Sequence, residues 1–255
     1  MSNFFVELCS GGLPWYAIVI AAAGAYFLGN INPAIIIGRA KGVDIRAQGS
    51  GNAGATNALR SLGKKAGALT FIIDVAKGWA GYYVPYIVLT NVLLKNMADG
   101  TAYMIWYVPI VLPAAMLCGL LVVIGHMYPA VFGFRGGKGV STAFGVLLAA
   151  SPLYALLLLA VVIVFVAIFR IVSISVMIAV AAALVLVFWG GGFLGESFFY
   201  NVGFLQFNVY QPLWVIIILA LVVWKHRSNI ERLFKGTEKK LNFGGGKKDK
   251  EGSGE

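Results

Sequence analysis

STAFGVLLAASPLYALLLLAVVIVFVAIF, residues 141–169, is an uncharged stretch that ends at Arg170. A helix needs about 20 apolar residues to cross the hydrocarbon core of a bilayer, and this stretch is too long for one comfortable helix. Ser151–Pro152 interrupts it with a local stop signal. If Arg170 lies inside the cell, residues 139–169 must fold as two crossings, the first barely long enough to span. The stretch therefore predicts a break near Ser151.

Working outward, further apolar runs flank this stretch on both sides. They predict an all-α, polytopic membrane bundle of about seven transmembrane helices, or six if Arg170 lies outside. The clearest spans are Trp15–Ile37, Ala66–Leu93, Ala102–Ile124, Ile171–Trp189 and a run that ends at Trp224. We expect one integral-membrane domain over residues 1–240, an external loop near Gly190–Phe207, and a disordered charged tail over 241–255.

The distribution of cations predicts the orientation of the chain. Residues 1–14 carry only Glu7, whereas six cations follow the first span, and Lys225 and Arg227 follow the last. Cytoplasmic loops carry the excess of Lys and Arg, so the N-terminus is predicted outside and the C-terminus in the cytoplasm. The formal net charge of +10 would suggest nucleic acid in a soluble protein, but here anchoring explains most of it and no nucleic-acid partner is expected. Membrane lipids are the expected surroundings.

The first polar cluster, QGSGNAGATNALR at residues 48–60, lies beside a membrane helix. Its glycines permit tight turns and close approach to a ligand, and its short polar side chains offer hydrogen bonds. Arg60 offers a planar two-pronged cation for phosphate. The pattern indicates an anion-binding loop at a helix N-terminus. The candidate residues are Gly49, Ser50, Gly51, Asn52, Gly54, Thr56, Asn57 and Arg60.

Two further clusters are predicted on the same face of the membrane. FRGGKGVST at residues 134–142 supplies glycine amides, one lysine and hydroxyls, but its spacing differs from a nucleotide-binding P-loop. In residues 225–238, three polar side chains recur at intervals of three and share one helical face, with a carboxylate beyond Gly236. The candidates are Gly136, Gly137, Lys138, Gly139, Ser141 and Thr142 in the second cluster, and His226, Asn229, Arg232 and Glu238 in the third.

Asp74 and Lys77 lie three residues apart within the second span. Charges inside a membrane are functional candidates by default. This pair is interpreted as structural support, either bracing its own helix or orienting Arg60. Carboxylates are otherwise too sparse and scattered for a magnesium site, so no metal and no cofactor is expected. The sequence has no Ser-His-Asp arrangement and no cysteine on the predicted cytoplasmic side that could act as a nucleophile. We therefore expect no covalent acyl-enzyme.

Taken together, three segments resemble the bacterial membrane acyl-phosphate:glycerol-3-phosphate acyltransferase family. They are GSGNAGATNALR, the GH-x-x-P…FRGGKG-x-ST segment, and KHRSNI-x-RL-x-x-G-x-E, and the likeness covers about residues 24–240. The resemblance implies a seven-helix fold in the cell membrane with its site at the cytoplasmic face. It also implies acyl phosphate and glycerol 3-phosphate as substrates and 1-acyl-glycerol 3-phosphate (lysophosphatidic acid) as product, the first acylation of bacterial phospholipid synthesis. We expect a monomer.

The resemblance and the residues together yield a mechanistic hypothesis. Arg60, Lys138 and glycine amides hold the two phosphates, with the GGKG segment assigned mainly to glycerol 3-phosphate. Ser50, Asn52 or Thr56 stabilises the developing oxyanion. The proton of the attacking hydroxyl passes either to His226, beside Asn229, or to a phosphate oxygen of the donor. Arg232 and Glu238 support the site.

Two other classes of function remain as alternatives. A transporter of phosphorylated anions would place polar residues along a transmembrane path, whereas here they gather at one face. A membrane phosphotransferase should need a divalent metal, so activity in excess chelator would exclude it.

Overall fold

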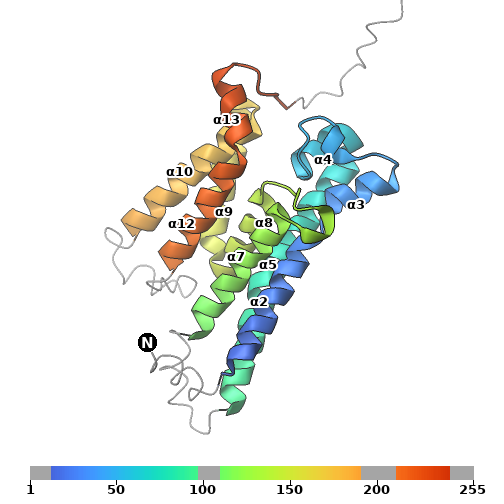
Figure 1. The fold of residues 1–255 in the computed structure, drawn as a ribbon. Coiled ribbons are helices and arrows are strands. Elements are labelled where there is room, and N and C mark those ends of the chain that lie inside the picture. The colour runs from blue at the N-terminus through green and yellow to red at the C-terminus, as the bar shows by residue number, and fades with distance from the viewer. Residues whose placement is uncertain (1–12, 97–109, 191–210, 242–255) are drawn as a thin grey trace, which may run out of the picture.

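The computed structural model describes residues 13–96, 110–190 and 211–241, and the regular structure in this part of the chain consists of helices, without strands. The all-α prediction is therefore confirmed for the described residues. The long helices form one bundle (Figure 1). Three short helices lie at the same end of it: α3 (Pro33–Ala40), α4 (Ala55–Leu62) and α13 (Arg227–Phe234). Beyond Gly190, which ends α10, the predicted loop near Gly190–Phe207 lies outside the described residues, as does the tail beyond residue 241. The longer helices are α2 (Trp15–Asn30), α5 (Lys64–Asn96), α7 (Leu112–Met127), α8 (Val140–Ala150), α9 (Pro152–Phe169), α10 (Val172–Gly190) and α12 (Gln211–Lys225).

The predicted break near Ser151 is confirmed. Helix α8 ends at Ala150 and α9 begins at Pro152, which occupies the first helical position, where its missing N–H has no partner to lose. Arg170 ends α9 in the left-handed conformation. Among the described residues, three segments are long and apolar enough to span a membrane, or four if α12 and α13 (Arg227–Phe234) count as one bent span. The count of seven spans stays a prediction.

The first predicted span, Trp15–Ile37, is not one continuous helix. The structure divides it into α2 and α3 (Pro33–Ala40), with a break at Ile31 and Asn32. The Asn32 side chain accepts a hydrogen bond from the Ile35 amide at 3.1 Å, and Pro33 lies at the start of the new helix. An Asn cap followed by Pro is a strong start signal, and it overrides the apolar run.

Glycines let the central helices approach one another closely. A Cβ on Gly78 of α5 would collide with the Thr142 carbonyl oxygen of α8, and a Cβ on Gly145 of α8 would collide with the Val75 carbonyl oxygen of α5. Small residues at helix contacts are the usual means of close packing in membranes. Helices α5, α7 and α8 therefore form a rigid centre, which carries the second polar cluster at its end.

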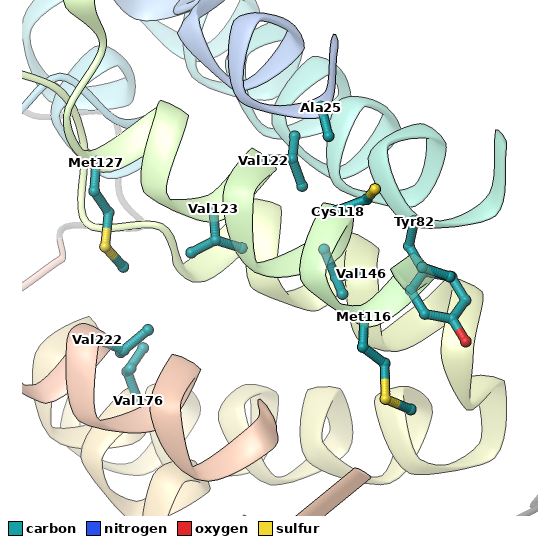
Figure 2. Packing of buried hydrophobic residues seen from close by; sticks show 11 residues of the cluster. Ala25, Tyr82, Met116, Cys118, Val122, Val123, Met127, Val146, Val176 and Val222 are labelled. Carbon is teal, nitrogen blue, oxygen red and sulfur yellow. The ribbon is translucent and has the colours of Figure 1, made fainter. Parts of the chain in front are cut away.

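The buried core gathers side chains from six helices. Val122 and Val123 of α7 lie at its middle, with Val146, Val176 and Val222 contributed by α8, α10 and α12 (Figure 2). Between helices within a bilayer, such side chains stabilise the bundle by close van der Waals packing rather than by removal from water. This core fixes the ends of the helices that carry the polar clusters.

Candidate active site

The first cluster folds as a tight loop that leads into α4 (Ala55–Leu62). Gly49 and Gly51 both have positive φ, as the prediction of tight turns requires. The Asn57 side chain organises this loop from below: its amide nitrogen donates to the carbonyl oxygens of Ile45 and Gln48, and its oxygen accepts from the Ser50 amide at 2.9 Å. Asn57 is buried and braces the loop, while Ser50 is exposed at its rim.

This arrangement predicts that Gly49→Ala impairs the loop. A Cβ there would collide with Asn57 Oδ1, and φ is +62°. Gly42→Ala is the matched control, because Gly42 has φ +70° but nothing within 4 Å of an added Cβ. Both variants should carry strain on the order of 1–3 kcal/mol. Only Gly49→Ala should lower the initial rate of acyl transfer, by about tenfold. Equal rates in the two variants would contradict this role of Asn57.

The second and third clusters meet directly. Lys138 Nζ donates to Asn229 Oδ1, which joins the glycine loop before α8 to α13. Burial lowers the pKa of Lys138 to about 8, although Glu238 opposes that shift. Arg60 and Arg232 also lie close enough to lower this pKa. The predicted gathering of these cations at one place is thus what the structure shows.

Glu238 is the hub of the third cluster. Its Oε1 accepts from Asn229 Nδ2 at 2.6 Å and from Ser173 Oγ at 2.8 Å, and its Oε2 pairs with Arg232 Nε at 2.7 Å. Burial disfavours the charged carboxylate, but these hydrogen bonds and Arg232 outweigh burial and lower the pKa of Glu238. The carboxylate is therefore ionised at neutral pH and holds three helical partners.

The segment after α13 closes the site against the first cluster. Arg60 Nη2 donates to the Lys239 carbonyl oxygen at 2.9 Å, and Lys239 Nζ lies 3.4 Å from the Gly49 carbonyl oxygen. The Leu241 amide donates to the Arg170 carbonyl oxygen at 2.6 Å, at the end of α9. All three sequence clusters are thereby connected through hydrogen bonds.

His226 lies between α12 and α13, beyond the end of the apolar helix, and is buried. Its Nδ1 lies 2.7 Å from the Val222 carbonyl oxygen, which can only accept, so Nδ1 carries the hydrogen and Nε2 keeps its lone pair. Burial, and then the charge of Lys138, lower the pKa of His226 to about 4. The ring is neutral at ordinary pH and can accept one hydrogen bond.

Several predicted residues lie away from this meeting point. Thr142 is fully buried where α8 contacts α5. One alternative was that Asp74 and Lys77 orient Arg60. Their partner is instead His126 of α7, whereas Arg60 reaches the Lys239 carbonyl oxygen. By contrast, Gly136, Gly137 and Gly139 lie at the meeting point, where they form the loop around Lys138. Ser141 follows in the first turn of α8.

The sequence interpretation missed Ser173, Lys239 and His126. Ser173 follows Arg170 at the predicted cytoplasmic end of a span, and this position could have identified it as a candidate site residue. Lys239 follows Glu238 in a segment whose path the sequence does not specify. His126 belongs to the quoted GH-x-x-P segment, yet only the structure pairs it with Asp74.

Comparison with known proteins decides the family. A family model described as glycerol-3-phosphate acyltransferase matches residues 19–236. The chain belongs to the glycerol-3-phosphate acyltransferase family. A glycerol-3-phosphate acyltransferase of Clostridioides difficile (strain 630) is 38% identical over 227 residues, 89% of this chain and 96% of the relative. That of Aquifex aeolicus (strain VF5) is 38% identical over 217 residues, 84% of this chain and 94% of the relative.

Solved structures place this acyltransferase family chain in the same fold class. PlsY, an integral membrane glycerol 3-phosphate acyltransferase, matches in its glycerol 3-phosphate form with a TM-score of 0.67 and 35% identity, covering 88% of this chain and 96% of that one. Its lysophosphatidic acid form matches with a TM-score of 0.65 and 34% identity, covering 88% and 95%. The family resemblance drawn from the three motifs is confirmed.

Proposed function

We propose that this acyltransferase uses acyl phosphate as donor and transfers its acyl group to the 1-hydroxyl of glycerol 3-phosphate. The products are 1-acyl-glycerol 3-phosphate and inorganic phosphate. The reaction takes place at the cytoplasmic face of a bacterial inner membrane, without metal or cofactor and without a covalent acyl-enzyme. The solved forms of PlsY with glycerol 3-phosphate and lysophosphatidic acid support the acceptor and the product.

One observation carries the proposal: an apolar cavity begins next to the cationic end of the bundle. The cavity has a volume of about 220 Å³, and its lining begins at Val140 and Ser141, immediately after the loop of Lys138. It follows α8 to Ala150 and Ser151, which at 1.5 Å per residue is a depth of about 15 Å. Phosphate at the cations and an acyl chain in the cavity would bring the reacting carbonyl to the boundary between them.

Charge accounts for the binding of two phosphates at one place. Lys138, Arg60 and Arg232 offset the repulsion between the donor phosphate and glycerol 3-phosphate, and Glu238 is already engaged by its three donors. The side-chain cations carry this binding, because the amides of Gly51, Gly54, Gly136 and Gly137 already donate to carbonyl oxygens of the chain. Most of the rate acceleration would come from holding the hydroxyl against the acyl carbon.

The reaction is a direct substitution at the acyl carbon. A new C–O bond forms from the glycerol 1-oxygen, and the bond from the acyl carbon to the bridging phosphate oxygen breaks. Ser50, Asn52 or Thr56 stabilises the carbonyl oxygen as charge develops on it. We assign the hydroxyl proton to a phosphate oxygen of the donor, because a histidine with a pKa of about 4 is a poor proton acceptor near neutral pH.

The experiment that tests the proposal uses purified protein with radiolabelled glycerol 3-phosphate, excess chelator, and palmitoyl phosphate or palmitoyl-CoA. Labelled lysophosphatidic acid should form from palmitoyl phosphate alone. Product from palmitoyl-CoA alone would overturn the donor assignment, and a requirement for added metal would overturn the metal-independent mechanism.

The position of His226 predicts that it orients the hydroxyl rather than removing its proton. His226→Gln should lower kcat by about tenfold, whereas loss of an obligatory base costs roughly 10²–10⁴-fold. The acidic limb of the kcat profile against pH should stay where it is. If His226→Gln instead lowered kcat by about 10⁴-fold and abolished the acidic limb of the kcat profile, His226 would be the general base.

The pKa of Lys138 predicts how acceptor binding depends on pH. Lys138 is charged below about pH 8 and neutral above it, so its attraction for phosphate is present at neutral pH and is lost as the pH rises through that value. Because kcat/KM reports the free enzyme, kcat/KM for glycerol 3-phosphate should fall above about pH 8. Lys138→Arg should move this fall to higher pH. If kcat/KM of Lys138→Arg fell at the same pH as in the wild type, the titrating group would be a residue other than Lys138.

A further inference from the structure

A buried ionic cluster lies beneath the active site, within the bundle. It consists of Asp74 and Lys77 of α5 and His126 of α7, whose exposed fractions are 1%, 4% and 3%. Lys77 Nζ lies 2.7 Å from Asp74 Oδ1 and 2.8 Å from His126 Nδ1. Nothing in the acyl-transfer steps described above uses these groups.

Lys77 Nζ joins three parts of the bundle. It donates to the Ile31 carbonyl oxygen at 2.6 Å where α2 breaks into α3, hydrogen-bonds with His126 Nδ1, and forms an ion pair with Asp74 Oδ1. Asp74 Oδ1 lies 3.2 Å from the same Nδ1, so this ring nitrogen faces both members of the ion pair. Asp74 and Lys77 together thus fix the orientation of the imidazole.

The oriented ring of His126 stands against the glycine loop. The Gly137 amide donates to the His126 carbonyl oxygen at 3.1 Å, and an added Cβ on Gly137 would collide with His126 Nε2. The same Cβ would lie 2.8 Å from the Ala53 carbonyl oxygen of the first cluster, which accepts from Asn32 at 3.2 Å. His126 therefore adjoins a point where the two phosphate-binding loops approach each other, one residue before Lys138.

We infer that Asp74, Lys77 and His126 are positioning residues that hold the Gly136–Gly139 loop, and with it Lys138, in place for glycerol 3-phosphate. The inference rests on the proposed function in one respect, namely that Lys138 binds the acceptor phosphate. A purely mechanical brace would need no charge, because well-packed apolar residues in place of a buried ion pair are often equally or more stabilising. Because the His126 ring contacts the loop, the charges of Asp74 and Lys77 that orient the ring also position the loop.

The test measures binding of glycerol 3-phosphate by titration calorimetry on monodisperse protein in detergent, with no acyl donor present. His126→Gln should raise Kd by about tenfold, because a displaced Lys138 loses its alignment with the phosphate. Asp74→Asn combined with Lys77→Met removes both charges together and should raise Kd to a similar extent. With all three substitutions, Kd should again rise by only about tenfold, since both changes act through the same ring.

Val122→Ala is the matched control, because Val122 is a fully buried residue of α7, one turn from His126, whose side chain faces Gly81 of α5. It should lower the thermal midpoint while leaving Kd within about twofold. Gly137→Ala approaches the contact from the loop side without altering a buried charge, and it too should raise Kd. It supplies the same readout if His126→Gln yields no monodisperse protein.

The possible results distinguish a failure of the positioning role from a failure of the proposed function. An unchanged Kd in the His126 and Gly137 variants, an equal loss in Val122→Ala, or multiplicative losses to about a hundredfold would overturn the positioning role. Wild-type protein that binds no glycerol 3-phosphate would instead overturn the proposed acceptor site. Binding of the acceptor without use of palmitoyl phosphate would overturn only the donor assignment.

Discussion

Lys138→Met should reduce kcat/KM for glycerol 3-phosphate by about a hundredfold, mainly through KM. The lysine is the cation that joins the second and third clusters, since its Nζ donates to Asn229. Methionine keeps much of the side-chain volume but removes both the charge and the donor. Truncating one partner of a buried, hydrogen-bonded charge contact costs about 2–5 kcal/mol, and a hundredfold loss, about 2.7 kcal/mol, lies within this range.

The matched control for Lys138→Met is Arg135→Met. Arg135 is an exposed cation of the same loop, three residues earlier in the chain. Loss of a solvent-exposed charge of this kind should change kcat/KM by less than about fivefold. Steady-state kinetics over a range of glycerol 3-phosphate concentrations separates the two cases. Equal losses in both variants would indicate that net charge, rather than the position of Lys138, attracts the substrate.

Glu238→Ala should have the second large effect, a loss of about a hundredfold in activity accompanied by a lower thermal midpoint. The substitution removes the acceptor shared by Ser173, Asn229 and Arg232, and so leaves Asn229 without the contact that holds it toward Lys138. Each buried donor left unpaired costs about 1–3 kcal/mol. The strap from Gly236 to Leu241 would also lose its main attachment to the bundle.

Two variants refine the interpretation of Glu238. Glu238→Gln retains an oxygen acceptor but loses the charge opposite Arg232, so its activity should fall between those of wild type and Glu238→Ala. Glu231→Ala is the matched control, because Glu231 is exposed on the same short helix. Initial rates and thermal unfolding in detergent measure both properties. If Glu231→Ala were as impaired as Glu238→Ala, the net charge near α13, rather than the hydrogen bonds of Glu238, would determine activity.

Features written in local sequence could be predicted in this chain. Ser151–Pro152 identified the helix break, because proline restricts the residue before it and cannot continue a helix. Glycine, asparagine and cation patterns identified the three clusters, and their meeting at one end of the bundle follows from chain topology. The intervals of His226, Asn229 and Arg232 placed them on one face, and the structure brings Asn229 to Lys138.

Features that depend on partners far along the chain could not be predicted. Nothing near Asp74 in the sequence indicates His126, which reaches it only because α7 packs against α5. Ser173 becomes part of the site because the strap after α13 carries Glu238 across to α10. The break at Ile31 was readable from Asn32 and Pro33, but the surrounding apolar residues obscured it.

The shortness of α8 has a consequence for the route of the lipid. Eleven residues rise only about 16 Å, roughly half the thickness of a hydrocarbon core of about 30 Å. A cavity that follows this helix from its polar end therefore reaches about as far as the middle of the bilayer. If that end faces the cytoplasm, as the cations predict, donor and product both occupy the inner leaflet, and the acyl tail has no need to cross to the outer one.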